Sequence, residues 1–445
     1  MIIRRLIAVW SAKIIKAACQ VAGKQGVTLA GKVALKIDPD ILKDLALQVR
    51  EKIIVVCGTN GKTTTNNLLC AAIESEGKKV VCNRTGSNML NGVASAFAIS
   101  AKWNGKLEAD YACIEIDEAS TVRIFPYFKP DMMILTNLFR DQLDRYGEID
   151  TTINLLKKAM NMAPDMKVIV NGDDALSTYL AMDSGNEYLT FGILEKQLEE
   201  DAGEIREGRF CKKCGEKLEY NFYHYSQLGD YYCPACDFKR PRLDFSATDI
   251  VFSGQLSFTV DDDHILANHR GFYNIYNILA AYAGVKTAGL NLFNYNKILS
   301  NYHPGNGRME KFHIKGTDVI LNLAKNPAGF NQNIQAVAQD KSIKDMIVLI
   351  NDNSQDGIDI SWLWDVDFDK FEKINANSII VSGIRRQDMQ LRFKYVGIPC
   401  TVEEDLEKAI RDRIDHGVKN LYLLVNYTAL LGTHNILKKM EREKR

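Results

Sequence analysis

The amino-acid sequence predicts an α/β protein in which a large domain on a parallel sheet, carrying a small inserted cysteine module, is followed by a smaller α/β domain. From residue 52 to about residue 180, apolar strand patterns alternate with helical patterns, as in a parallel sheet with crossover helices. Two C-x-x-C pairs then fall within residues 203–245, and a second set of strand patterns follows. We therefore expect a helical lead-in over 1–49, the large domain over 50–310 and the smaller domain over 311–445.

A glycine-rich turn joins the first strand of this sheet to the next helix. It has the sequence Gly58-Thr59-Asn60-Gly61-Lys62-Thr63-Thr64. Such a turn directs backbone N–H groups and a helix N-terminus at one anion, above all a nucleotide phosphate. We expect Lys62 to lie on the β- and γ-phosphates and the hydroxyl of Thr63 or Thr64 to hold Mg²⁺. The spacing is shorter than G-x-x-x-x-G-K-[ST], because Val56 stands where that motif has its first glycine. The alternative is a turn that merely carries a lysine.

Composition limits the classes of function. The 445 residues are 46% hydrophobic and 25% charged, which is typical of a globular protein. Basic and acidic residues number 56 each, so the composition does not indicate a nucleic-acid partner. Apart from the two C-x-x-C pairs, the cysteines are scattered, several of them in apolar segments, as expected for reduced thiols in the cytoplasm.

The N-terminal segment, residues 1–18, has a basic amphipathic helical pattern. Arg4, Arg5, Lys13 and Lys16 interrupt its apolar residues. We expect it to pack on the body of the protein, and peripheral contact with the inner face of a membrane is the alternative. No stretch approaches the roughly 18 uncharged apolar residues that a membrane span needs.

Acidic and polar residues follow several of the predicted strands. Glu115 ends one strand, and a carboxylate there is placed to hold Mg²⁺ directly or through water, with Glu118 as the alternate. The alternative for both residues is that each is simply a surface acid at the end of a strand. The stretches Thr136–Gly147 and Asn171–Asp174 follow the next strands, and polar residues clustered in such loops more often line a ligand site than occur by chance.

The cysteine pairs predict a metal site. Eighteen residues separate the two pairs, which are Cys211, Cys214, Cys233 and Cys236. At this spacing four thiolates can enclose Zn²⁺ in a tetrahedron. Because cysteine fills all four positions, no place is left for a water, and the zinc is expected to be structural.

Two further stretches suggest ligand contacts. Asn274 and Asn277 share one face of a helix, where their amides could recognise the edge of an adenine, although helix capping is the simpler role for Asn274. In the C-terminal domain, Lys325-Asn326-Pro327 follows a strand, and residues 351–365 alternate acids with tryptophans.

These motifs together resemble the Mur ligase superfamily. The family's G-T-x-G-K-T-T loop is similar to Gly58–Thr64, and its T-N-x-x-x-D-x-L-D-x-[HY]-G segment to Thr136–Gly147. Its G-x-x-N-x-x-N-x-L-A-A helix is similar to Gly271–Ala281, and its G-R-x-E hinge to Gly307–Glu310. The resemblance implies a Mur-ligase-like fold with a nucleotide site that includes the loop, Asn274, Asn277 and Arg308.

Departures from the family pattern point to one branch. Most Mur ligases carry D-x-A-H-N-P, whereas this chain has Asn322 and Lys325 in place of the aspartate and histidine. Gln142 stands where histidine is frequent, and the cysteine module is an additional feature. With the D-G-x-D-x-S-W-x-W-D stretch at Asp356–Asp365, these features resemble the MurT branch, the synthetase subunits of lipid II isoglutaminyl synthases in Gram-positive bacteria.

The resemblance implies a carbon–nitrogen ligase of peptidoglycan synthesis that uses ATP and Mg²⁺. The α-carboxylate of D-glutamate in the lipid II stem peptide would be phosphorylated, and ammonia would displace the phosphate to give D-isoglutamine. The ammonia would come from a partner glutaminase subunit, GatD, in a heterodimer. Lys62 is then a candidate catalytic residue. Asp359, with Asp356 as the alternate, would orient the partner's histidine, and a turn-capping aspartate is the simpler explanation.

Two other functions are weighed against this one. A stand-alone ligase of the Mur or folylpolyglutamate type would add an amino acid in place of ammonia. A nucleotide-switched protein whose zinc ribbon docks a nucleic acid is the third hypothesis, and the balanced charge disfavours it.

Overall fold

The three-dimensional structure is a computed structural model of the chain. It describes residues 2–21, 26–141, 149–197, 207–253, 255–268, 271–302, 307–353 and 355–443.

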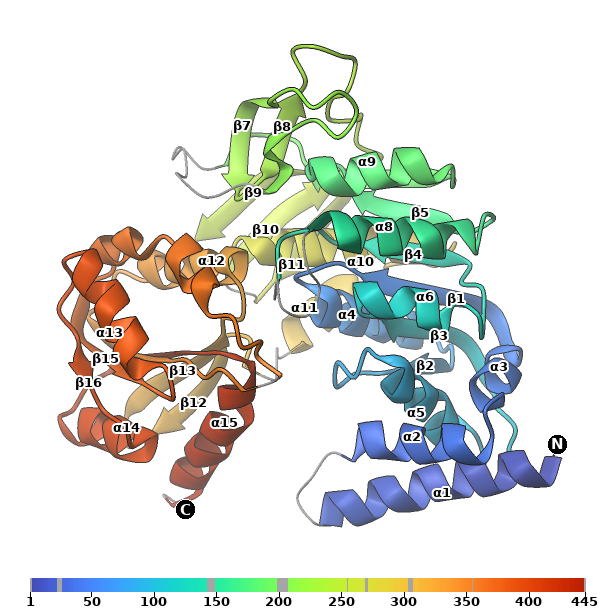
Figure 1. Cartoon of the computed structure of the whole chain (residues 1–445), viewed down its shortest axis with the longest axis horizontal. Coiled ribbons are helices and arrows are strands. Elements are labelled where there is room, and N and C mark those ends of the chain that lie inside the picture. The colour runs from blue at the N-terminus through green and yellow to red at the C-terminus, as the bar shows by residue number, and fades with distance from the viewer. Residues whose placement is uncertain are drawn as a thin grey trace.

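A large, mostly parallel sheet forms the first domain (Figure 1). In the described part of the chain its strand order is β11-β10-β9-β6-β5-β4-β1-β3-β2, parallel from β2 to β9 and antiparallel where β10 and β11 close one edge. The strands are β1 (Val49–Cys57), β2 (Val80–Cys82), β3 (Ala109–Glu115), β4 (Met132–Leu135), β5 (Lys167–Asn171), β6 (Tyr188–Ile193), β9 (Phe245–Ser253), β10 (Gln255–Val260) and β11 (Asp263–Ala267).

Helices cover both faces of this sheet, because its central strands are apolar on both sides. Ile54 and Val56 of β1 pack in one core with α4 and α10, while Val55 and Cys57 pack in the opposite core with α5, α8 and α9. The helices are α4 (Lys62–Ser75), α5 (Leu90–Ser100), α6 (Thr121–Ile124), α8 (Ile149–Asn161), α9 (Ala175–Ser184), α10 (Tyr273–Thr287) and α11 (Tyr295–Asn301).

Three helices precede the sheet: α1 (Ile2–Val21), α2 (Val27–Ile37) and α3 (Ile41–Ala46). Figure 1 shows α1 outermost, below α2 and α5. Helix α1 buries its small residues Ala8 and Ala12 and leaves Ile3, Trp10 and Ile14 exposed. Among the described residues, no helix is long and apolar enough to cross a bilayer.

The cysteine module is inserted between β6 and β9. It contains the hairpin of β7 (Glu219–Tyr225) and β8 (Leu228–Tyr232), which stands at the top of Figure 1. Its small core combines Leu218, Tyr231 and Phe238 with Ala175 at the start of α9, so the module is seated on the end of that helix.

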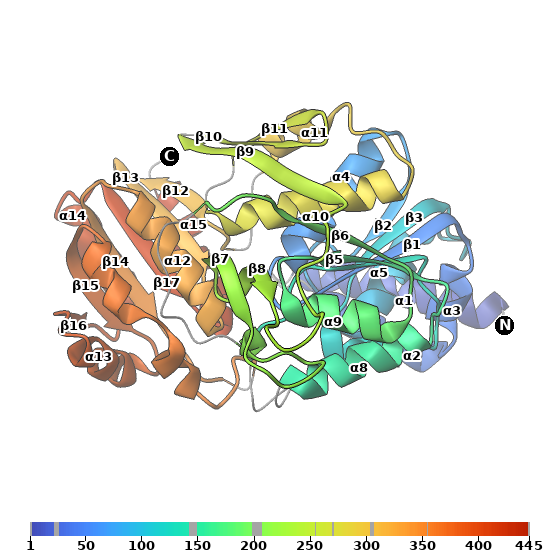
Figure 2. The same cartoon turned by 90° about the horizontal axis from the view of Figure 1, so that it is seen from above.

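The C-terminal domain has its own sheet, which Figure 2 shows beside the first domain. Its order in the described residues is β12-β13-β17-β14-β15-β16, with only the β12–β13 pair antiparallel. The strands are β12 (Glu310–Ile314), β13 (Thr317–Leu323), β14 (Lys344–Leu349), β15 (Ala376–Ser382), β16 (Thr401–Val402) and β17 (Asn420–Val425). The helices are α12 (Pro327–Gln339), α13 (Arg386–Tyr395), α14 (Leu406–Asp415) and α15 (Tyr427–Arg442). The predicted fold class is confirmed.

Candidate active site

The turn between β1 and α4 has the geometry of a phosphate-binding loop. Gly58 and Gly61 have φ angles of 117° and 87°, which side-chain-bearing residues rarely adopt. A Cβ atom on Gly58 would lie 2.3 Å from Oγ1 of Thr136, and one on Gly61 would lie 2.0 Å from Oδ1 of Asn277. Both glycines are therefore required by conformation and by close packing, and α4 begins at Lys62 directly after them.

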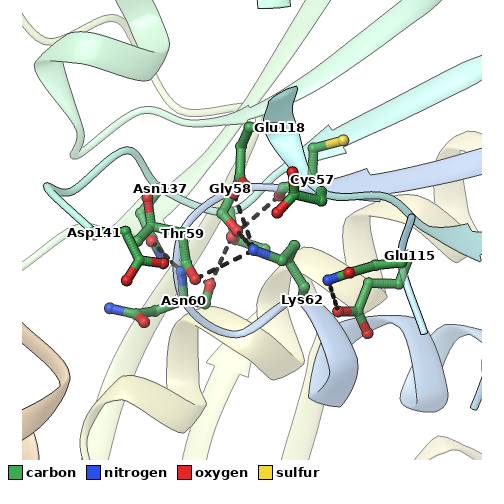
Figure 3. A network of polar contacts seen from close by, with 12 residues as sticks. Cys57, Gly58, Thr59, Asn60, Lys62, Glu115, Glu118, Asn137 and Asp141 are labelled. Atoms are coloured by element: carbon green, nitrogen blue, oxygen red, sulfur yellow. Dashed lines mark hydrogen bonds and ion pairs between the residues drawn. The ribbon is translucent and has the colours of Figure 1, made fainter. Parts of the chain in front are cut away.

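Lys62 is buried at the start of α4, within the loop (Figure 3). Its Nζ donates to the carbonyl oxygen of Gly58 at 2.5 Å and lies 3.0 Å from Oε1 of Glu118. Burial lowers the pKa of Lys62, but the carboxyl groups around it, led by Glu118, outweigh burial and raise the pKa above its ordinary value. The lysine therefore stays cationic, as contact with phosphate oxygens requires.

The segment Thr136–Asp141, called here the β4 loop, holds the phosphate loop from the side (Figure 3). The backbone N–H of Asn60 donates to Oδ1 of Asn137 at 2.9 Å, and that of Thr59 donates to the Asn137 carbonyl at 2.9 Å. The Thr136 hydroxyl donates to the carbonyl of Asn60 at 2.7 Å. The remainder of the predicted polar stretch, including Gln142, lies outside the described residues.

The residues predicted to hold Mg²⁺ lie together at this site. Glu115 is buried at the end of β3; its Oε1 accepts from Nδ2 of Asn88 at 2.9 Å, whereas its Oε2 is buried without a hydrogen-bond partner. A Cβ on Gly86 would lie 3.3 Å from Oγ1 of Thr63 and 3.7 Å from Oε2 of Glu115, so hydroxyl and carboxylate face the same space. An unpartnered carboxylate oxygen beside a hydroxyl suits a hard cation.

Glu118, the alternate ligand, is engaged differently, because its carboxylate is paired with Lys62. Burial raises the pKa of Glu118, and the charge of Lys62 opposes that rise. Of the two acids, Glu115 therefore has the freer oxygen.

The two asparagines of α10 reach the end of the phosphate loop. Asn277 packs its side chain against Gly61 and donates from Nδ2 to Oδ1 of Asn274 at 3.1 Å. Since α10 begins at Tyr273, Asn274 lies inside the helix and does not precede it as a cap. Burial raises the pKa values of Tyr273 and Tyr302, and the charge of the nearby Arg308 opposes that rise. Recognition of adenine by the two amides stays a prediction.

The C-terminal domain contacts the phosphate loop directly. Asn326 caps α12, accepting at Oδ1 from the N–H of Gly329 at 2.8 Å, and its Nδ2 donates to Oδ1 of Asn60 at 3.1 Å. The neighbouring Lys325 lies 2.5 Å from Oδ2 of Asp141 in the β4 loop. The altered D-x-A-H-N-P segment is thus a contact between the domains. No sequence signal identified Asp141 as the partner of Lys325.

The four predicted zinc ligands converge. One ligand atom from each of Cys211, Cys214, Cys233 and Cys236 lies within 4.8 Å of the others. The Sγ atoms of Cys211 and Cys236 are 3.6 Å apart, and those of Cys214 and Cys233 are 3.4 Å apart. Zn–S bonds of about 2.3 Å in a tetrahedron place sulfurs at about this separation, so the cluster fits Zn²⁺.

The two candidate aspartates of the C-terminal domain differ in exposure. Asp356 is buried and accepts from the N–H of Thr428 at 2.8 Å and from its hydroxyl, which anchors the loop to α15. Asp359 is exposed, and its Oδ1 accepts from the N–H of Ser361 at 2.8 Å. Hydrogen bonding to Ser361 lowers the pKa of Asp359. Asp359 is thus the aspartate that another protein could reach, although its bond to Ser361 also makes it a turn-capping residue.

Fold and site define the class of protein: a Mur ligase. The family model for the Mur ligase middle domain matches residues 56–233, and the family model for the MurT ligase C-terminal domain matches residues 323–430. A pseudomurein peptide ligase type C from Methanothermus fervidus shares the fold, with a TM-score of 0.70 at 23% identity over 89% of this chain and 80% of its own. The MurF ligase from Thermotoga maritima, solved with ADP, gives a TM-score of 0.61 at 14% identity over 94% and 85% of the two chains.

Relatives narrow the class to one family. The lipid II isoglutaminyl synthase (glutamine-hydrolyzing) subunit MurT of Staphylococcus aureus (strain COL) is 36% identical over 96% of both chains. The corresponding subunit of Streptococcus pneumoniae (strain R6) is 36% identical over 93% of this chain and 92% of its own. The chain belongs to the MurT family of Mur ligases, which confirms the resemblance seen in the sequence. Mur ligases use ATP and Mg²⁺.

Proposed function

We propose that this chain is the synthetase subunit of a two-chain amidotransferase that converts the α-carboxylate of D-glutamate in lipid II to the amide. The observation that carries the proposal is the convergence of Lys62, Thr63 and the unpartnered oxygen of Glu115 at a phosphate loop that the C-terminal domain contacts through Asn326. The names of the relatives, glutamine-hydrolysing isoglutaminyl synthase subunits, support the same chemistry.

The first half of the proposed reaction activates the carboxylate. A carboxylate oxygen attacks the γ-phosphorus of ATP, the bond to the bridging oxygen of ADP breaks, and an acyl phosphate forms. Lys62 and the loop N–H groups stabilise the charge on the transferring phosphoryl group. Bound Mg²⁺, for which Thr63 and Glu115 are the proposed ligands, would neutralise phosphate charge. Asn274, Asn277 and Arg308 complete the proposed nucleotide site.

The second half forms the amide. The nitrogen of ammonia attacks the acyl carbon, the bond from that carbon to the phosphate oxygen breaks, and the nitrogen loses a proton as phosphate departs. The C-terminal domain contacts the phosphate loop through Asn326 and the β4 loop through Lys325, and these contacts would limit access of water to the acyl phosphate.

Ammonia is proposed to come from a glutaminase partner, GatD, in a heterodimer. Asp359 is exposed on the C-terminal domain, and hydrogen bonding to Ser361 lowers its pKa below the ordinary value, which is itself well below neutral pH, so the side chain is ionised. Ile358, its neighbour in the chain, and Trp364, in the same 351–365 stretch, are 68% and 51% exposed, and large exposed apolar side chains of this kind support a protein interface. Asp359 would hold the partner's histidine in its productive tautomer.

The competing proposal is a stand-alone ligase that joins an amino acid to the activated carboxylate. It would need a site for the amino acid at the contact between the domains. There Lys325 is paired with Asp141 instead. The replacement of the family's aspartate and histidine by Asn322 and Lys325, together with the Asp356–Asp365 stretch, favours the amidotransferase.

The identity of the nucleophile distinguishes the amidotransferase from the stand-alone ligase. Purified chain is given lipid II, MgATP, [¹⁵N]ammonium and a mixture of the common amino acids, and the product is read by mass spectrometry. We expect one hydroxyl to be replaced by one ¹⁵N amino group, with ATP consumed in step. Incorporation of any amino acid in place of ammonia would contradict the amidotransferase proposal.

A peripheral place at the inner face of the membrane is also proposed, since the substrate is lipid-linked. Ile3, Trp10 and Ile14 on the outer side of α1 are 74%, 44% and 60% exposed, and α1 carries four cationic residues and no acid. An exposed apolar face with a tryptophan suits a lipid surface, and the cations of α1 add to this only in part, because Arg5 is paired with Asp44. Sedimentation with vesicles containing phosphatidylglycerol should retain the chain and lose Ile3→Asp/Ile14→Asp. Equal recovery of both proteins would contradict this placement.

A further inference from the structure

The turn of the inserted hairpin reaches the β4 loop through one buried amide. Gln227, between β7 and β8, has no exposed surface. Its Nε2 donates to the carbonyl of Leu138 at 2.7 Å and to Oδ1 of Asp174 at 2.8 Å, and its Oε1 accepts from the N–H of Gly208 at 2.9 Å. Both amide hydrogens and the carbonyl oxygen are thus used, so the side chain has one fixed position.

A second contact runs beside the first. The rings of Tyr225 at the end of β7 and Phe139 in the β4 loop pack with their centroids 6.0 Å apart, and both are buried. Asp174 also contacts the β4 loop, because its Oδ2 accepts a hydrogen bond from the N–H of Leu138 at 2.8 Å. The middle of the β4 loop is therefore held by the hairpin and by the start of α9.

The opposite side of the β4 loop holds the phosphate loop. The Thr59 hydroxyl accepts from the N–H of Phe139 at 2.9 Å and donates to the carbonyl of Phe139 at 3.0 Å. Asn137, one residue before Leu138, accepts from the N–H of Asn60 at 2.9 Å. A shift of Leu138 and Phe139 would therefore move Thr59 and Asn60.

We propose that the cysteine module, including its β7–β8 hairpin, positions the nucleotide site, and that Gln227 is the positioning residue. The inference rests on the proposed use of the phosphate loop for ATP. Gln227 fixes the β4 loop, and the β4 loop fixes the phosphate loop in the conformation that receives phosphate. The cysteine module thereby affects nucleotide binding without contacting a substrate.

The metal cluster would keep the hairpin in place for this role. Beyond the cysteines, the core of the module is small, and Leu218, Tyr231 and Phe238 supply most of it. Its base is tied to the large domain by Arg240, whose guanidinium lies 2.6 Å from the buried Asp173, and by the N–H of Gly229, which donates to the Asp173 carbonyl at 2.9 Å. Four thiolates on Zn²⁺ would cross-link the far end of the module.

The test replaces Gln227 by methionine, which is similar in size but offers no amide. Asn221→Ala is the matched control, because Asn221 is an exposed residue of the same hairpin whose Nδ2 donates to Oδ2 of the half-buried Asp230 at 2.9 Å, away from the β4 loop. We expect Gln227→Met to keep its zinc and to raise KM for MgATP on the order of tenfold in the ammonium-driven reaction. Asn221→Ala should match the wild type.

Amide hydrogen exchange supplies a readout independent of the reaction. In Gln227→Met, and in wild-type chain stripped of metal by a chelator, peptides covering residues 136–141 should exchange faster than in the wild type. Tyr225→Leu, which leaves Gln227 intact, is the second variant in case methionine prevents folding, and it should show the same acceleration. Unchanged exchange and an unchanged KM in the folded variants would overturn the proposal. A wild-type chain without amidation activity would count against the proposed function alone.

Discussion

The ammonium group of Lys62 lies 3.0 Å from Oε1 of Glu118, and about nine-tenths of each side chain is buried. A buried ion pair of this kind contributes little net stability, because desolvation of both ions offsets their attraction. Removing one partner is different, since it leaves the other charge buried and unpaired. The pair is thus better explained as a holder for the lysine at the phosphate loop.

Lys62→Met should therefore lose activity and stability together. We expect the ammonium-driven kcat to fall on the order of a hundredfold or more, as when a transition-state donor is removed. The free energy of unfolding should fall by about 3–5 kcal/mol, because Glu118 is left uncompensated. Denaturant unfolding of Lys62→Met/Glu118→Gln should recover much of the stability without activity. Lys78→Met, which breaks an exposed pair with Glu51, is the control; recovery of activity in the double variant would contradict this role.

Glu115→Gln should weaken the use of Mg²⁺. The substitution keeps the shape of the side chain but replaces a carboxylate oxygen by an amide group, which binds Mg²⁺ poorly. We expect the Mg²⁺ concentration for half-maximal rate to rise about tenfold at fixed ATP. Glu108→Gln, on an exposed side chain paired with Lys102, should leave the titration unchanged. An unaltered titration in Glu115→Gln would exclude Glu115 as a ligand.

The pair of Lys325 and Asp141 should couple the domains. Both side chains are partly exposed, at 29% and 14%, so the expected effect on the free energy of unfolding is at most about 1 kcal/mol. The effect on rate should be larger, because the pair sets how the C-terminal domain meets the β4 loop. Either Lys325→Ala or Asp141→Ala should lower kcat/KM for MgATP several-fold, and the double variant should lose no more than the worse single one. Fully additive losses in this double-mutant cycle would show that the residues act independently.

The cysteine cluster should bind about one zinc per chain. Cys214→Ser or Cys236→Ser should lower the bound metal in elemental analysis to near background and lower the melting temperature, since a structural zinc contributes directly to folding. Cys400→Ser, outside the cluster, should retain the metal. Purified wild-type chain with no transition metal and an unchanged melting temperature on zinc addition would rule the site out.

Much of the fold followed from the sequence because its central strands are short apolar runs that end in recognisable turns. Strands β2, β3, β4 and β5 all form within residues 52–180, where apolar strand patterns alternate with helical patterns, and β3, β4 and β5 are buried on both faces. The strands at one end of the sheet, β9–β11, were not predicted. They are partly exposed, and β10 and β11 run antiparallel to their neighbours, so these segments resemble loops in their mixture of polar and apolar residues.

The candidate site was predictable where one short segment carries the chemistry, as in Gly58–Thr64 and the four cysteines. It was not predictable where the contact depends on tertiary packing. Gln227 is a single glutamine in a turn, 89 residues from Leu138 in the chain, and no motif marks it. The pairing of Lys325 with Asp141 likewise depends on how the two domains meet.

The proposed division of labour between two chains is tested by a comparison of two nitrogen sources. The rate of lipid II amidation is measured for wild type and Asp359→Asn, each with the glutaminase partner, once with glutamine and once with ammonium as nitrogen source. Asp369→Asn, at another exposed aspartate of the same domain, is the control. We expect Asp359→Asn to lose at least about tenfold in the glutamine-driven rate, because an orienting acid is removed, and to keep the ammonium-driven rate. Equal loss of both rates, or no loss of either, would contradict it.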